Sequence, residues 1–264
     1  MNMEAIIIAA VSLFSSVIGA VCGIGGGVII KPVLDAAGLL PVDTVSFLSG
    51  CTVLSMSVIS VAKRLRDIER SKFDPRMAAL LASGAVIGGL LGKDLYHRIL
   101  SRFAGGQRIG AVQAGVLLAV TIGTLIYTIN RSKVKTLQVS GDFVFLIIGA
   151  ALGVVSAFLG IGGGPVNLVV LYYFFSMGTK EAVSYSLYII MFSQSASLVS
   201  SIITGRIPEF SVAALILMVS CGLVGGIAGT KVNKKIREKD VDRLFAGLMV
   251  AMIVINIFNV IKYV

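Results

Sequence analysis

Ten apolar segments occupy most of this 264-residue chain, and each is close to the roughly twenty residues that a helix needs to cross a bilayer. Charged residues make up only 14% of the chain and its mean hydropathy is +0.97, which a water-soluble domain of this size could not accommodate. The sequence therefore predicts an all-α integral membrane protein of about ten transmembrane or partly spanning helices, surrounded by membrane lipid. The segments are 4–22, 24–42, 44–62, 77–93 and 109–129, followed by 141–159, 161–178, 182–204, 211–230 and 243–261.

The chain also repeats itself at one constant spacing. The string GIGGG occurs at Gly23–Gly27 and again at Gly160–Gly164, each time after an apolar segment. The match continues at the same spacing on both sides of the string, which a chance five-residue coincidence would not do. The sequence predicts two transmembrane repeats, 1–136 and 137–264. Pairs that match at this spacing include Ala20 with Ala157, Val33 with Val170, Leu34 with Leu171, Phe73 with Phe210 and Gly88 with Gly225.

The second segment of each repeat leaves two topologies open. Lys31, Pro32 and Asp35 interrupt it in the first repeat, and Pro165 opens it in the second, so it either crosses or re-enters and returns. If both segments cross, each repeat has five passes and the second repeat is inverted. If both only re-enter, each repeat has four passes and the two repeats are parallel.

The distribution of basic residues favours the inverted five-plus-five arrangement. In that arrangement sixteen Lys and Arg residues lie on one side and six on the other, whereas the parallel arrangement divides them eleven to eleven. Because basic loops concentrate in the cytoplasm, both termini are expected outside it. The first apolar run has no preceding Lys or Arg and is interpreted as a retained first span, not a signal peptide. The sixteen are Lys63, Arg64, Arg66, Arg70, Lys72, Arg76, Arg131, Lys133, Lys135, Lys180, Lys231, Lys234, Lys235, Arg237, Lys239 and Arg243, and the six are Lys93, Arg98, Arg102, Arg108, Arg206 and Lys262.

The contiguous glycines predict a broken helix at each GIGGG string. Glycine is a poor helix former, and unpaired amides at membrane depth are tolerated only against protein or a water-filled cavity. Amides at the start of a helix attract anions, so two breaks brought together by a pseudo-two-fold axis would form one anion site near the midplane. The alternative is that these glycines only permit close helix packing. The candidate anion-binding glycines are Gly23, Gly25, Gly26, Gly27, Gly160, Gly162, Gly163 and Gly164.

Three polar side chains within the segments extend this candidate site. Lys31 would complement an anion, although it can instead pair with Asp35 one turn later. Asn167 can hydrogen-bond an oxyanion or cap the broken helix. Gln194 is a large polar group at membrane depth, where a functional role is favoured. The serines of the third segments and the glycines of the fourth segments are expected to serve helix packing.

The two GIGGG strings resemble those of the sulfite exporter TauE/SafE family of membrane transporters, also called the toluene sulfonate uptake permease family. The first copy, from Gly23 to Leu34, fits the family pattern of glycines followed by a proline and a leucine. In the second copy Pro165 follows the glycines directly, and Val169 stands where the first copy has Pro32. The resemblance covers essentially the whole chain, one repeat for each half. It implies a carrier of small anions, mainly sulfur oxyanions and organosulfonates.

These features predict a secondary transporter of a small sulfur-containing anion in a bacterial-type inner membrane, with alternating access around the paired breaks. An anion channel with the same site is the alternative, and its flux would rise linearly instead of saturating. No Walker-type loop is present, so ATP is not expected to drive transport directly. An enzyme is disfavoured because no segment offers a paired-carboxylate, Ser/His or metal constellation. No metal or other cofactor is expected, the basic loops are attributed to lipid headgroups and not to nucleic acid, and homo-oligomerisation is left open.

Overall fold

The computed structural model describes residues 3–65, 73–102, 106–159 and 161–263. These ranges form ten α-helices and one 3₁₀ turn and contain no strand. Eight of the helices are long and apolar enough to cross a membrane, which confirms the predicted all-α, multi-pass membrane fold. The elements are α1 (Met3–Cys22), α2 (Gly27–Ala37), α3 (Val42–Leu65), α4 (Pro75–Arg102), α5 (Gly106–Asn130), η2 (Arg131–Lys133), α6 (Asp142–Leu159), α7 (Gly164–Phe175), α8 (Thr179–Ile203), α9 (Val212–Lys235) and α10 (Glu238–Tyr263).

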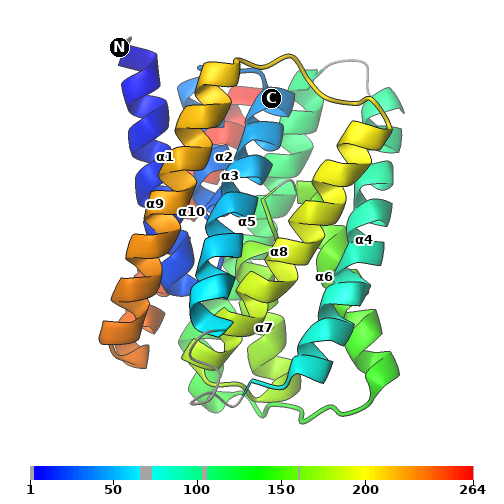
Figure 1. Ribbon diagram of the computed structural model, residues 1–264, viewed down its shortest axis with the longest axis vertical. Coiled ribbons are helices and arrows are strands. Elements are labelled where there is room, and N and C mark those ends of the chain that lie inside the picture. The colour runs from blue at the N-terminus through cyan, green and yellow to red at the C-terminus, as the bar shows by residue number, and fades with distance from the viewer. Residues whose placement is uncertain (1–2, 66–72, 103–105, 160, 264) are drawn as a thin grey trace.

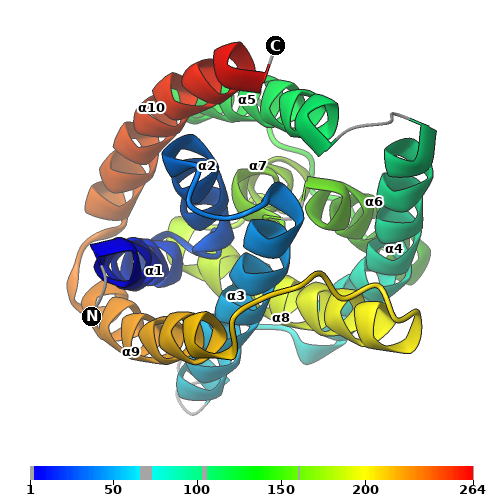
Figure 2. The same cartoon turned by 90° about the horizontal axis from the view of Figure 1, so that it is seen from above.

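The long helices form a bundle in which α2 and α7 lie inside a ring of their neighbours (Figure 2). Three packed pairs account for much of the ring: α1 with α9, α4 with α6, and α5 with α10. α3 and α8 pack against each other and join these pairs through contacts of α3 with α9 and of α8 with α4. The arrangement places the two short helices, with the GIGGG strings that precede them, in the protein interior.

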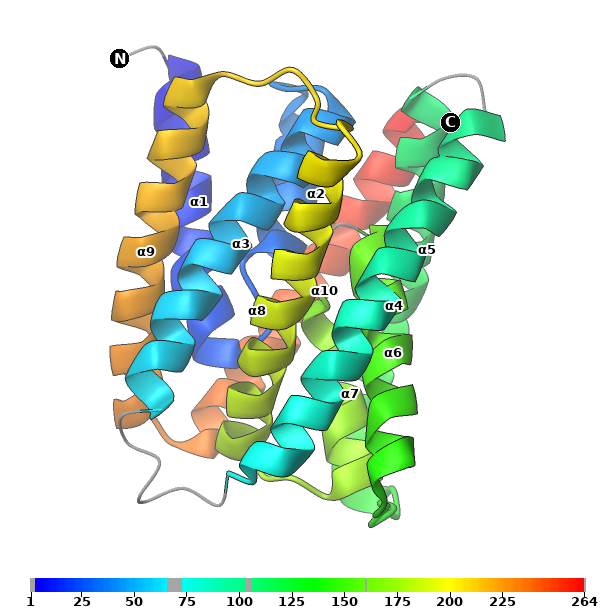
Figure 3. The same ribbon diagram turned by 45° about the vertical axis from the view of Figure 1, so that its right-hand side comes forward.

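The weak second segments are short helices. α2 has 11 residues and α7 has 12. At 1.5 Å per residue, each covers roughly 16 to 18 Å of a hydrocarbon core about 30 Å thick. α2 runs from the first break back to the end of the bundle that holds the N-terminus (Figure 3). Each short helix therefore covers only part of the membrane depth and reverses the direction of the helix before it.

The direction of the chain alternates from each helix to the next (Figure 1). Both termini lie at one end of the bundle, together with the segment that joins α8 to α9, whereas the connections from α5 to α6 and from α9 to α10 lie at the other end. α1 and α6 consequently run in opposite directions. The five-plus-five arrangement requires this chain path. The end of the bundle opposite the termini carries most of the basic residues, and its assignment to the cytoplasm stays a prediction.

The helices of the two halves match at one constant spacing of 137 residues, which is the spacing from Gly23 to Gly160. We call this match the shared register. At this spacing the first residues of α2, α3 and α4 match those of α7, α8 and α9, and the last residue of α1 matches that of α6. Contacts also match when the halves are exchanged, since α1 packs on α9 as α6 packs on α4. Both observations support two inverted repeats, 1–136 and 137–264, as a proposal about the origin of the fold.

Glycines of α4 and α9 allow these helices to approach α6 and α1 closely, as predicted for the fourth segments. A Cβ on Gly88 would overlap the carbonyl oxygen of Ala150 in α6, and a Cβ on Gly225 would lie 3.0 Å from the carbonyl oxygen of Leu13 in α1. Leu13 and Ala150 are themselves a matching pair in the shared register. Small residues therefore set the interhelical distance in both halves.

We expect Gly88→Ala to destabilise the protein. The added methyl group meets backbone, which cannot rotate away, so α4 and α6 must separate at a cost of about 1 to 3 kcal/mol. A lower melting temperature in detergent would show this effect. Gly123→Ala in α5 is the control, because a Cβ there meets nothing within 4 Å and alanine is the better helix former. Equal melting temperatures for the two variants would contradict the packing role.

The expected end of the fourth segment was wrong. The segment was placed at 77–93, but α4 continues to Arg102. Similarly, most of the basic stretch between Lys231 and Arg243 belongs to α9 and α10, which are separated only by residues 236–237. Charged residues at these positions extend the helices beyond their apolar spans, because long basic side chains can reach the headgroup region. Lys93 is thereby placed on a helix inside the bundle.

Candidate functional site

Each GIGGG string is a break between two helices. α1 ends at Cys22 and α2 begins at Gly27, and α6 ends at Leu159 and α7 begins at Gly164. Gly25 and Gly163 adopt φ angles of +68° and +91°, a region that residues with a Cβ rarely enter. Gly160 lies outside the described residues. The positive φ angles explain why glycine is required where the chain reverses.

The two breaks contact each other. A Cβ on Gly27 would lie 2.7 Å from the carbonyl oxygen of Ile161, and a Cβ on Gly164 would lie 3.4 Å from the carbonyl oxygen of Ile24. These two contacts are equivalents of each other in the shared register. Val53 fills the space against both breaks, since its side chain lies next to Gly25 and Gly162. The breaks therefore meet in packed protein in this conformation.

Side chains of other helices bind the carbonyl groups left free at the breaks. Asn233 of α9 donates to the carbonyl of Val21 at 2.6 Å, and Gln113 of α5 donates to that of Phe158 at 3.0 Å. The hydroxyl of Ser186 donates to the carbonyl of Gly23 at 2.5 Å. A helix end at membrane depth needs such partners because lipid offers none. These bonds connect both breaks to the surrounding bundle.

A cavity of about 340 Å³ lies beside the second break, between α3, α4, α5, α6 and α8. The segment between α8 and α9 borders it, so the cavity lies toward the end of the bundle that holds both termini. Its volume suits a small ligand. We call it the pocket, and the residues that line it are Asp43, Ser46, Phe47, Gly50, Lys93, Gln113, Ala157, Gln194, Ser197, Leu198, Ser201, Arg206, Ile207 and Pro208.

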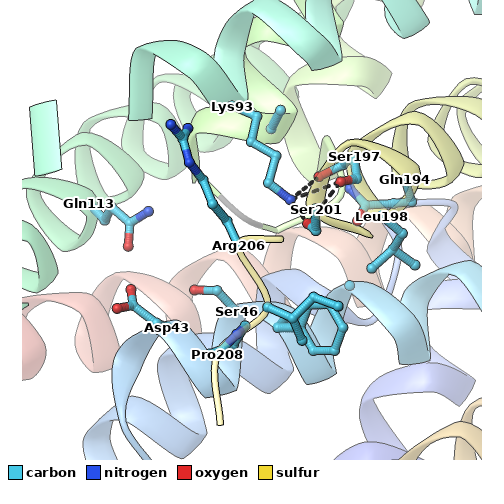
Figure 4. A pocket seen from close by; sticks show the side chains of 14 residues that line it. Asp43, Ser46, Lys93, Gln113, Gln194, Ser197, Leu198, Ser201, Arg206 and Pro208 are labelled. Atoms are coloured by element: carbon cyan, nitrogen blue, oxygen red, sulfur yellow. Dashed lines mark hydrogen bonds between the residues drawn. The ribbon is translucent and has the colours of Figure 1, made fainter. Parts of the chain in front are cut away.

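The polar lining of the pocket comprises two cations, two amides, the carboxylate of Asp43 and three serine hydroxyls (Figure 4). Lys93 donates to the carbonyl oxygen of Ser197 at 2.8 Å and to the hydroxyl of Ser201. Neither Lys93 nor Arg206 has a carboxylate within salt-bridge distance in the described part of the chain. Gln113 and Gln194 add amide groups. Such a lining is suited to an anion with several oxygen acceptors.

Arg206 owes its position to contacts of the segment between α8 and α9. The Thr44 hydroxyl donates to the carbonyl of Glu209 at 2.9 Å, and the rings of Phe47 and Phe210 lie 5.3 Å apart. Both contacts hold the segment against the start of α3. Arg206 is thereby brought to the mouth of the pocket, opposite Lys93 (Figure 4).

Of the predicted site residues that the structure describes, Gln194 alone lines the pocket. Its Oε1 atom lies 3.1 Å from the position of a Cβ on Gly50, and its Nε2 atom lies 3.6 Å from that of a Cβ on Gly162. The side chain thus occupies space that two glycines leave free. It joins the pocket to the second break.

The other predicted polar residues lie near the breaks but outside the pocket. The Nζ atom of Lys31 is 3.3 Å from Asp35 Oδ2 and donates to the Ser46 hydroxyl at 2.8 Å. Of the two roles that the sequence left open for Lys31, the intrahelical pair is the one that its contacts match. Asn167 packs against Gly163, and neither of its side-chain polar atoms has a hydrogen-bond partner among the described residues. Ser46 links Lys31 to the pocket, because Ser46 accepts the hydrogen bond from Lys31 and also lines the pocket.

Lys93, Arg206 and Gln113 line the pocket but were not predicted as site residues from the sequence. A signal was available on α8, where Gln194, Ser197 and Ser201 follow one another at intervals of three and four residues and so share one helical face. A polar stripe at membrane depth predicts a neighbour with complementary charge. Lys93 on the neighbouring helix was considered only as one of the basic residues that indicate topology, so this match was not predicted.

The chain matches a known family profile and a bacterial membrane protein, but no solved structure. The profile of the family "Sulfite exporter TauE/SafE" matches residues 8–255. The chain is 23% identical over 255 residues to the "Probable membrane transporter protein YunE" of Bacillus subtilis (strain 168), and the match covers 90% of this chain and 92% of that protein. No solved structure matches the chain significantly.

Proposed function

The chain belongs to the sulfite exporter TauE/SafE family of membrane transporters, and we propose that it carries a small sulfur-containing anion by alternating access. It is a multi-pass integral membrane protein with eight candidate spanning helices. The substrate proposed is sulfite, an organosulfonate or a similar anion. The observation that carries the proposal is the pocket, which Lys93 and Arg206 line together with Asp43. Neither cation has a carboxylate within salt-bridge distance in the described chain.

The chemistry of the pocket fits an oxyanion with a tetrahedral or pyramidal sulfur group. Within the described residues, Lys93 donates to neutral serine oxygens, so an anion can replace these partners with a charge-assisted bond. The guanidinium of Arg206 can bind two oxygens at once. Amide groups of Gln113 and Gln194 can complete the coordination. Apolar neighbours such as Phe47 and Leu198 leave room for a short organic substituent.

The contact between the breaks supports a transporter more than a channel. Val53 and Ile190 are at most 1% exposed and pack against the glycines of the breaks, so packed protein lies where the pocket approaches the second break. A channel needs a continuous path, whereas a transporter needs a closed contact that opens in a second conformation. The breaks, where α2 and α7 meet α1 and α6, are the proposed places of that change.

Counterflow in proteoliposomes tests the proposal. Purified protein is first screened by thermal shift against sulfite, sulfate, thiosulfate, taurine and sulfoacetate, because a ligand at 100 times its Kd stabilises the protein by about 2.7 kcal/mol. Uptake of [³⁵S]sulfite should then saturate with concentration and accelerate when unlabelled sulfite fills the vesicles. Flux that rises linearly without acceleration would favour the channel. No thermal shift and no flux with any of the five anions would reject the proposed substrate class.

A further inference from the structure

The shared register of the two halves predicts where a counterpart of the pocket lies. Residues that match in this register occupy equivalent places, so each pocket residue in one half has an equivalent toward the opposite end of the bundle. The equivalent of Ser201, which binds Lys93, is Arg64 near the end of α3. The lower end of α3 lies far from both termini (Figure 3). Arg64 therefore stands at the basic end, which the charge distribution assigns to the cytoplasm.

The contacts of Arg64 fall on equivalents of the pocket lining. Its Nη2 atom donates to the carbonyl of Ala20 at 3.3 Å, and its Nη1 atom donates to the hydroxyl of Ser184 at 3.4 Å. Ala20 is equivalent to Ala157, and Ser184 is equivalent to Phe47, both of which line the pocket. The guanidinium thus occupies the place that the pocket has in the other half of the molecule.

The charge of Arg64 is uncompensated in the described part of the chain. Its two hydrogen-bond acceptors are neutral, and both bonds are long for hydrogen bonds, at 3.3 and 3.4 Å. Its buried Nε atom has no hydrogen-bond partner among the described residues. Arg76, Arg98 and Arg131, by contrast, each lie within salt-bridge distance of an aspartate. A half-buried guanidinium on weak neutral partners is suited to receive an anion.

The equivalent of Lys93 adds a second unpaired group on the same side. This residue is Thr230 of α9, which is 1% exposed and whose hydroxyl has no hydrogen-bond partner among the described residues. At the pocket, the cation is Lys93 on α4 and the hydroxyl is that of Ser201 on α8. At the opposite end, the cation is Arg64 on α3 and the hydroxyl is that of Thr230 on α9. A cation and a hydroxyl therefore stand at matching register positions at both ends, with the two roles exchanged between the halves.

We propose that Arg64 is the cation of a second anion-binding site, on the cytoplasmic side, which opens when the pocket closes. The site takes the same small oxyanion as the pocket and rests on the proposed function. Val183 and Leu187, the equivalents of Ser46 and Gly50, are fully buried, so this site has no open lining at their positions in the present conformation. Arg64 meanwhile binds the Ala20 carbonyl and Ser184, and an arriving anion takes their place.

Sided transport kinetics test this inference, with sulfite as the probe. Right-side-out and inside-out vesicles report the KM for [³⁵S]sulfite at the two faces separately. Arg64→Gln should raise the KM at the cytoplasmic face at least tenfold and change it less than twofold at the other face, since a charged hydrogen bond is lost on one side only. Lys93→Gln should give the opposite pattern. Lys63→Gln, the adjacent basic residue on α3, removes the same charge and should leave both values unchanged.

A second variant separates charge from folding. Arg64→Lys keeps the charge but loses the planar fork, so its KM at the cytoplasmic face should lie between those of the wild type and Arg64→Gln. Elution from a sizing column in detergent reports whether each variant folds. An equal change at both faces, or no change in Arg64→Gln or Arg64→Lys, would overturn the second site while leaving transport itself intact. Absence of saturable flux in the wild type would instead reject the proposed function, and the second site with it.

Discussion

Replacing Lys93 with glutamine should raise the KM for sulfite at the pocket face by about 10- to 100-fold. In this structure the side chain binds only neutral oxygens of Ser197 and Ser201, so its charge is available to the anion. A hydrogen bond to a charged group contributes about 1.5 to 3 kcal/mol, and each 1.4 kcal/mol corresponds to a tenfold change in affinity. Uptake of [³⁵S]sulfite into proteoliposomes over a range of concentrations measures the effect.

Arg98→Gln is the matched control for this variant. Arg98 is on the same helix, carries the same charge and pairs with Asp94 at 2.6 Å, but it does not line the pocket. Its removal tests whether a lower net charge at this end of the protein is enough to weaken uptake. Lys93→Arg should retain part of the affinity. An unchanged KM in Lys93→Gln would mean that the pocket does not hold the transported anion.

Hydropathy was sufficient to predict the membrane fold. Every predicted segment corresponds to a helix, because a long apolar run in a bilayer has few alternatives to a helix. The contiguous glycines likewise predicted the breaks, since Gly25 and Gly163 adopt angles that other residues rarely enter. What hydropathy cannot supply is the end of a helix whose last turns are charged. That limit left Lys93 at the last position of the predicted segment 77–93, although α4 continues for nine more residues to Arg102.

The sequence also could not predict which side of each glycine break faces a cavity. Contiguous glycines predict freedom to turn, but they do not show which side of the turn faces a cavity. In the structure, Gly27 and Gly164 face the opposite break, and Val53 covers Gly25 and Gly162. Whether the amides of the breaks contact the anion stays a prediction. Gln194 was singled out because a large amide at membrane depth is costly without a role, and it lines the pocket, but its contact with the anion stays a prediction.

The contacts of Lys31 change what the sequence predicted for it. Lys31 and Asp35 retain only 4% and 8% side-chain exposure, and Lys31 also binds Ser46. A buried ion pair is more sensitive to the loss of one partner than an exposed pair is, because the remaining charge is then buried and uncompensated. Lys262 donates to the carbonyl of Asp35.

We therefore expect Asp35→Asn and Lys31→Met each to destabilise the protein by about 3 to 5 kcal/mol, whereas the double variant Lys31→Met/Asp35→Leu should recover most of the loss. Unfolding in detergent measures stability, and sulfite titration of the folded double variant measures affinity. Because Lys31 does not line the pocket, that affinity should stay within about twofold of the wild type, which corresponds to only about 0.4 kcal/mol. A stable double variant with tenfold weaker binding would instead make Lys31 a substrate contact, reached through Ser46. Additive losses of stability would show that the two side chains act independently, contrary to the 3.3 Å contact between them.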